Sequence, residues 1–138
     1  MQYLVSGKEM KLLDQNTSSK FHVPELVLME QAAMTFVRRL FFLQKEYHKE
    51  ISNVLILCGS GNNGADGLAI ARLFMQEGLT SCVCLCGEAA GHKTTESYQT
   101  QKAICQAYQI RMEEQIPEED FDLVIDALFG IGLSRNIE

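Results

Sequence analysis

The sequence has no apolar run close to the roughly 18 residues that a membrane-spanning helix requires. Its N-terminus also lacks the basic leader and apolar core of a secretory signal. We therefore expect a soluble, cytoplasmic protein with no membrane partner. With 138 residues, of which 46% are apolar, the chain is expected to form one compact domain over residues 1–138.

Positive charge is scarce. Twelve Lys and Arg residues against 18 Asp and Glu residues leave a formal net charge of -6. Surfaces that bind the nucleic-acid backbone are normally basic, so we expect no nucleic-acid partner. An anion must then be held by local geometry rather than by general attraction.

No C-x-x-C pair occurs, and the five cysteines are an odd number, which argues against a disulfide framework. Cys82, Cys84 and Cys86 alternate, so on a strand they would share one face. Their successive separations of roughly 7 Å are too large for one tetrahedral zinc ion. We expect them to be small buried residues packed beneath a helix.

Two helices are expected before the first strand. The run from Ser6 to Glu9 has the capping-box form and predicts a helix over residues 7–19. Pro24 is well placed to open a second helix, because proline has no N–H to leave unpaired there. The buried stripe of this second helix is expected to contain Leu26, Met29, Ala33, Val37 and Leu40.

The rest of the chain alternates strands and helices. Apolar runs predict strands over residues 54–58, 80–86 and 121–126, with a short strand near Met112. Between them we expect one helix that buries Ala69, Ile70, Leu73 and Phe74, and another over residues 94–108 that buries Ala103, Ile104 and Ala107. This order favours the α/β class, with an open parallel sheet, helices on both faces and right-handed crossovers.

A glycine-rich turn stands between the first strand and the following helix. Gly59, Gly61 and Gly64 satisfy the G-x-G-x-x-G pattern in the context that nucleotide binding demands. Glycines let a ligand approach the backbone, and the helix start favours a negative group. We expect a phosphate-bearing nucleotide here, and the alternative is an ordinary turn that needs unusual backbone angles.

The same turn carries more polar groups than a phosphate needs. Asp66 either caps the helix or binds a ribose hydroxyl or another substrate group. Asn63 could present its carbonyl oxygen to a hard cation, which prefers oxygen ligands. Asp126 ends the last expected strand, and if that strand adjoins the first, it faces Asn63 across the sheet edge. Alternatively, Asp126 only terminates its strand.

Residues 54–68 (VLILCGSGNNGADGL) and 126–133 (DALFGIGL) resemble the two signature stretches of the NAD(P)H-hydrate epimerases, the YjeF N-terminal domain family. Residues 7–10 (GKEM) leading into Asp14, and residues 24–30 (PELVLME) followed by Ala32 and Ala33, are similar to the opening of that family. The resemblance implies a Rossmann-like three-layer α/β/α fold with a mainly parallel sheet after two N-terminal helices. It implies interconversion of the R and S epimers of NADHX and NADPHX, the hydrated reduced nicotinamide cofactors. A potassium ion, a homodimer and a fused or associated ADP- or ATP-dependent dehydratase are also implied.

The resemblance also implies roles for particular residues. Asn63 and Asp126 match the potassium ligands, and Asp126 is our candidate for the catalytic group that moves protons. Ala65 stands where the family usually has glycine, and its methyl could crowd an approach to the backbone. The implied cofactor-binding residues are Asn62, Asn63, Gly64, Ala65, Asp66, Gly130, Ile131, Gly132, Leu133, Ser134, Arg135 and Asn136.

The family domain normally continues beyond the length of this chain and contributes further ligands. A sheet of three or four strands would leave an apolar edge, so we expect a domain that is incomplete at its C-terminus and poorly active alone. Two other functions remain open. One is a nicotinamide-dependent dehydrogenase with Glu88 at the ribose. The other is a non-catalytic scaffold of the same fold that binds a nucleotide or a partner.

Overall fold

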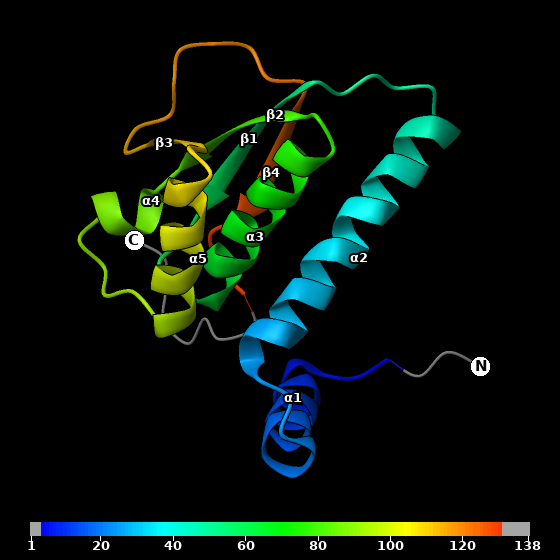
Figure 1. Ribbon diagram of the computed structural model, residues 1–138, viewed down its shortest axis with the longest axis vertical. Helices are drawn as coiled ribbons and strands as arrows, with labels where there is room; N and C mark the ends of the chain where they lie inside the picture. The colour runs from blue at the N-terminus through cyan, green and yellow to red at the C-terminus, as the bar shows by residue number, and fades with distance from the viewer. Residues whose placement is uncertain (1–3, 131–138) are drawn as a thin grey trace.

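The computed structural model describes residues 4–130, and Figure 1 shows helices packed beside a twisted sheet. The chain begins with two helices and then alternates strands with helices, as the sequence pattern predicts. The helices are α1 (Gly7–Phe21), α2 (Glu25–Glu46), α3 (Asn62–Gln76), α4 (Cys86–Ala89) and α5 (Glu96–Ala107), and the strands are β1 (Asn53–Cys58), β2 (Thr80–Cys84), β3 (Arg111–Glu113) and β4 (Leu123–Ala127).

The four strands of the described residues lie in the order β3-β2-β1-β4, and every neighbouring pair is parallel. After β1 the chain adds β2 and then β3 on one side, and it returns to place β4 on the other side of β1. The strand order therefore changes direction between β1 and β4. In open parallel sheets this switch point is where ligands bind, at the carboxyl ends of the strands.

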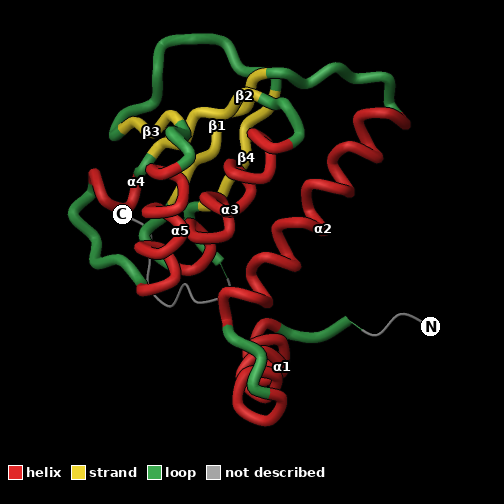
Figure 2. The backbone as a smooth tube through the Cα atoms, in the orientation of Figure 1, coloured by secondary structure: helices red, strands yellow, loops and turns green. Residues whose placement is uncertain are grey.

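Helices α2, α3 and α5 pack on one face of the sheet, where they bury Val54, Ile56, Val83 and Ile125 in the main core. Figure 2 shows α3 and α5 in front of the strands and α2 beside α3. These strand side chains share a face because paired residues of neighbouring strands point the same way. The predicted α/β class and the parallel sheet are confirmed.

The N-terminal helices agree with the predicted start signals. Ser6 and Glu9 form a capping box, and Pro24 is the N-cap of α2. The stripe predicted for α2 is confirmed, since Met29, Ala33 and Val37 are buried. In contrast, α1 buries none of its residues and lies at the end of α2, away from the sheet (Figure 1). Within residues 4–130 no helix is long and apolar enough to cross a bilayer.

Two sequence-based expectations were wrong in detail. The second strand ends at Cys84, and Cys86 lies in the short helix α4, so the three alternating cysteines do not share one strand. Helix α5 turns Tyr98, Gln101 and Cys105 inward and leaves Ala103 exposed. The apolar pattern failed for α5 because its largest buried side chain is an amphipathic tyrosine and one of its buried positions is an amide.

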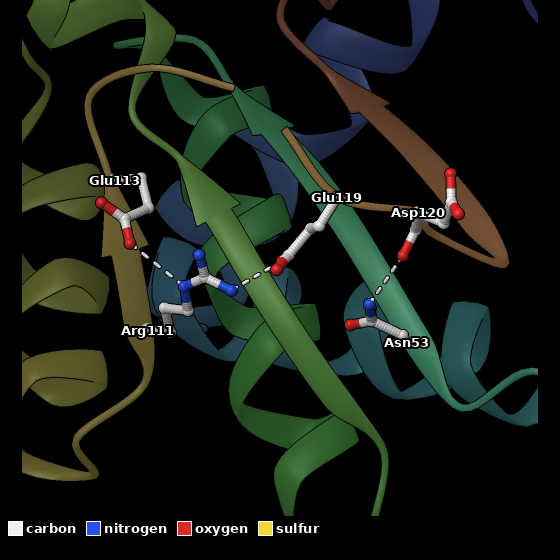
Figure 3. A network of polar contacts seen from close by, with 5 residues as sticks. All are labelled: Asn53, Arg111, Glu113, Glu119 and Asp120. Atoms are coloured by element: carbon white, nitrogen blue, oxygen red, sulfur yellow. Dashed lines mark hydrogen bonds and ion pairs between the residues drawn. The ribbon is translucent and has the colours of Figure 1, made fainter. Parts of the chain in front are cut away.

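The segment between β3 and β4, residues 114–122, crosses the other face of the sheet. On this face Leu55, Cys82 and Cys84 form a second buried cluster, and Phe121 packs against it. Figure 3 shows polar contacts of this segment. Arg111 of β3 forms an ion pair with Glu119 of the segment at 2.6 Å and another with Glu113 of β3 at 3.1 Å. This connection carries the chain from one edge of the sheet to the other without a helix.

Asp122, at the end of the segment 114–122, is hydrogen-bonded to the residues at the start of β1. One carboxylate oxygen accepts hydrogen bonds from the backbone N–H of Ser52, the Ser52 hydroxyl and the backbone N–H of Asn53, each at 2.9 Å. Asn53 in turn donates its side-chain amide to the carbonyl oxygen of Asp120 at 3.0 Å (Figure 3). These bonds place β4 beside β1, and the candidate site depends on that placement.

We predict that Asp122→Ala lowers the urea midpoint of unfolding at pH 7, because three donors lose their shared acceptor. The backbone hydrogen bond from Ser52, followed by that from Asn53, lowers the pKa of Asp122 below its ordinary 3.8. The stabilisation is therefore present above pH 3.8 and is lost as the pH falls through the lower folded-state pKa. Asp120→Ala is the control, since the Asp120 side chain makes no hydrogen bond to residues 4–130 and its bond to Asn53 uses the backbone carbonyl oxygen. Equal midpoints for both variants at pH 7 would contradict this account.

Candidate functional site

The glycine-rich turn lies directly after β1 and is packed too closely for side chains at two of its glycines. A Cβ on Gly59 would lie 2.0 Å from the carbonyl oxygen of Leu128, and one on Gly64 would lie 1.9 Å from the carbonyl oxygen of Gly59. The backbone N–H of Gly59 also donates to the carbonyl oxygen of Ala127 at 3.0 Å. The turn is thus joined to the segment after β4 by close backbone contact.

The segment that follows β2 supports the turn from another side. A Cβ on Gly87 would lie 2.2 Å from the backbone nitrogen of Ser60, and the N–H of Thr95 donates to the Ser60 carbonyl oxygen at 3.1 Å. Around Gly61, by contrast, a Cβ would meet no atom of residues 4–130 within 4 Å. The turn is therefore closed at Ser60 and open at Gly61, the N-cap of α3. A negative group can approach the first N–H groups of α3 from this open side.

Asn63 joins the two loops that follow β1 and β4. Its side-chain NH2 donates to the carbonyl oxygen of Phe129 at 3.1 Å. Gly130 lies so close that a Cβ there would be 3.3 Å from the Asn63 Cβ. The sequence interpretation was conditional on neighbouring strands, and the pairing of β1 with β4 meets that condition. One hydrogen bond therefore links both predicted loops at the switch point of the sheet.

Asp126 lies opposite Leu57 in the register of β1 and β4, and its side chain is exposed. One of its carboxylate oxygens accepts from the backbone N–H of Leu128 at 3.0 Å. That bond fixes the carboxylate against its own loop, and the second oxygen has no protein donor among the described residues. An exposed carboxylate with a free oxygen can exchange a proton with a bound ligand.

Asp66 lies within α3, whose N-cap is Gly61, so the suggestion that Asp66 caps this helix is wrong. Burial, followed by the negative charges of Glu25 and Asp14, raises its pKa from 3.8 to about 6. Glu25 also accepts a short hydrogen bond from the side-chain NH2 of Asn62. Sequence reasoning missed Glu25 as a site residue, since its only local signal was an acid in the first turn of a helix.

Asn63 and Asp126, the predicted metal ligands, both offer oxygen atoms. Within residues 4–130 no three His, Cys, Asp or Glu side chains are grouped so that they could hold a metal ion. The side-chain NH2 of Asn63 donates to the Phe129 carbonyl oxygen. The side-chain oxygen of Asn63 accepts no hydrogen bond from residues 4–130 and is available near the loop of Asp126. Oxygen ligands of this kind suit a hard cation rather than zinc.

The remaining predicted residues fall into three sets. Gly64, Ala65 and Gly130 belong to the two joined loops, and Gly64 and Ala65 are buried. Glu88, the ribose ligand of the dehydrogenase interpretation, instead pairs with Lys102 of α5 at 2.5 Å. The others lie outside the described residues: Ile131, Gly132, Leu133, Ser134, Arg135 and Asn136.

Known proteins resemble this chain over nearly its whole length. A family model described as YjeF-related protein N-terminus matches residues 25–138. The NAD(P)H-hydrate epimerase of Limosilactobacillus fermentum is 38% identical, with 97% of this chain and 62% of the relative covered. The epimerase of Lentilactobacillus buchneri is 36% identical, with 99% and 62% covered. The bifunctional NAD(P)H-hydrate repair enzyme Nnr of Dictyoglomus turgidum is 31% identical, with 98% and 26% covered.

The chain thus spans 62% of the length of the first two relatives. A solved structure gives an independent comparison of the fold. The crystal structure of the yeast protein Ynu0 matches with a TM-score of 0.77 at 20% identity, covering 99% of this chain and 60% of the yeast chain. At this identity the likeness concerns the fold alone, and it agrees with the expected Rossmann-like α/β/α architecture.

We predict that Gly64→Ala lowers the free energy of unfolding by about 3 kcal/mol, because its methyl would overlap the backbone of the turn. Gly61→Ala is the matched control, and it should change the free energy of unfolding by less than about 0.5 kcal/mol. Urea unfolding of both variants measures the difference. Equal stability of the two variants would show that the turn is not packed as described.

Proposed function

We propose, since this chain belongs to the family of YjeF-related protein N-termini, that it interconverts the R and S epimers of NADHX and NADPHX. The observation that carries the proposal is the hydrogen bond from Asn63 to the Phe129 carbonyl oxygen, which joins the two family loops at the switch point of the sheet. The printed names of the curated relatives support the same reaction and the same substrates. The reaction would repair damaged nicotinamide cofactors.

The binding role of the first loop follows from its backbone. Helix α3 begins at Asn62, and the N–H groups at the start of a helix together with its dipole favour a phosphate group. Gly61 leaves open space at this point. We assign these N–H groups to the pyrophosphate of the substrate. The side chains of Asn62, Asn63 and Asp66 are assigned to uncharged parts of the same substrate.

Asp126 is the group to which we assign proton transfer. Epimerisation at the hydrated ring carbon requires loss and return of the hydroxyl, or opening of the ring, and both routes need a proton to move. A positioned carboxylate performs this step. The N–H of Leu128 holds one oxygen of Asp126, which leaves the other to meet the substrate. The residues after Gly130 that the family resemblance implies would complete the substrate site.

A potassium ion belongs to the proposal as an auxiliary group. The free carbonyl oxygen of Asn63 and the carboxylate of Asp126 fit a hard monovalent cation in ligand chemistry. When bound, the cation supplies positive charge that favours the ionised carboxylate. These two side chains would hold it, while the orientation of Asn63 is already set by Phe129.

Partners are proposed on the family resemblance. They are a second copy of this chain and an ADP- or ATP-dependent dehydratase, fused or associated, that consumes one epimer. The name of the Dictyoglomus turgidum relative, a bifunctional repair enzyme, supports the second partner. The dehydrogenase alternative is weakened, because the Glu88 carboxylate pairs with Lys102.

We predict that Asp126→Asn lowers kcat/KM for epimerisation about 100-fold or more, because the amide cannot move a proton. Separation of R-NADPHX and S-NADPHX on a chiral column, over time, measures the rate. Asp120→Asn removes an exposed carboxylate whose side chain makes no hydrogen bond among the described residues, and it should retain wild-type turnover. Turnover by Asp126→Asn would place the proton-transfer group elsewhere. An inactive wild-type chain that binds a protein partner tightly would instead favour the scaffold function.

A further inference from the structure

The two asparagines at the start of α3 are held in the same way. Each donates its side-chain NH2 to a protein acceptor, Asn62 to the carboxylate of Glu25 and Asn63 to the carbonyl oxygen of Phe129. A side-chain amide is planar, and its oxygen and nitrogen point in different directions. Neither carbonyl oxygen accepts a hydrogen bond from residues 4–130, so both can meet a ligand. The side chains at the mouth of the turn form an acceptor surface.

The two protein acceptors come from different parts of the fold. Phe129 lies in the loop after β4, whereas Glu25 is the first residue of α2, next to the N-cap Pro24. Helix α2 is a rigid support, because Met29 and Ala33 are buried in the main core. Its Glu30 also pairs with Arg72 of α3 at 2.5 Å. The position of Glu25 relative to the turn is thus set by packing between the two helices.

We propose that Glu25 is a positioning residue of the candidate site, which holds Asn62 with its carbonyl oxygen toward the substrate. The inference rests on the proposed function and assigns a contact within it. Without the carboxylate of Glu25, the Asn62 amide could rotate and present its NH2 instead. The substrate would then have to order the exposed Asn62 side chain on binding, and this ordering lowers the affinity for the substrate.

The acceptor surface indicates which part of the substrate it meets. The Asn62 amide is bonded to Glu25, whose negative charge also acts on Asp66, so this part of the mouth repels a phosphate and suits hydrogen-bond donors. Burial, Glu25 and Asp14 raise the pKa of Asp66 to about 6, which is consistent with crowding of acidic groups at this mouth. The donors of a hydrated nicotinamide nucleotide are its hydroxyls and its carboxamide NH2. We assign Asn62 to one of these donors and leave the phosphates to the backbone N–H groups.

Kinetics of epimerisation with NADPHX test the assignment. Glu25→Ala should raise KM about fivefold, which corresponds to about 1 kcal/mol of lost pre-organisation, and leave kcat nearly unchanged. Glu25→Gln retains an acceptor oxygen at the same reach and should recover most of that loss. Glu25→Asp draws the carboxylate back by one methylene and should behave as Glu25→Ala does. Glu46→Gln, an exposed glutamate at the other end of α2, is the control and should match the wild type.

A second measurement does not depend on epimerisation. The side-chain NH2 signals of Asn62 in a 15N spectrum of the unliganded chain should move toward the positions of a free amide in Glu25→Ala and stay near the wild type in Glu46→Gln. Unchanged Asn62 signals, or a wild-type KM in Glu25→Ala, would overturn the inference. A wild-type chain that shows no epimerisation and does not bind NADPHX would overturn the proposed function, while the Asn62 signals would still decide whether Glu25 holds this amide.

Discussion

The parallel pairing of β1 with β4 is the interaction on which the candidate site depends. It places Leu57 beside Asp126 and Cys58 beside Ala127, so both strands end at the same level. The N–H of Gly59 extends the pairing by one more hydrogen bond, to the carbonyl oxygen of Ala127. Because β2 and β3 lie on the other side of β1, the loops after β1 and β4 meet at the point where the strand order reverses.

Close backbone packing at the glycines fixes the positions of the loops that follow β1 and β4. Gly59 and Gly64 allow the turn, the start of α3 and the segment after β4 to approach within distances that any side chain would prevent. Gly67 has a similar role deeper in the fold, where a Cβ would lie 2.8 Å from the Cβ of Ala127. Glycine makes the unfolded chain more flexible, so folding loses more conformational entropy at these positions. In return, two loops distant in sequence share one rigid backbone framework.

The polar side chains of the site are oriented by this framework. Asn63 and Asn62 each use their NH2 groups on protein acceptors, and Asp126 uses one oxygen on Leu128. Within residues 4–130, the remaining oxygen atoms of these side chains have no protein donor, and they lie near a helix start whose N–H groups favour an anion. A dinucleotide that carries both phosphates and hydroxyls matches this division. An anion without donor groups would meet repulsion from the carboxylates.

Much of the fold was readable from local patterns. The apolar run from Val54 to Cys58, the glycines after it and the capping box at Ser6 are signals within a few residues of each other. Which residues of a helix are buried was harder to predict. In α5, Tyr98 and Gln101 are buried although Ala103 and Ile104 are more apolar. The bond between Glu25 and Asn62 spans 37 residues and depends on how α2 packs against α3, so no local pattern encodes it.

The loops after β1 and β4 should act as one binding site. Titration of the 15N-labelled chain with NADPHX, followed by backbone amide shifts, measures this. The amides of residues 59–66 and 126–130 should shift together and fit a single dissociation constant. Shifts confined to one of the two loops, or centred on a distant surface such as the C-terminal end of α2, would contradict it.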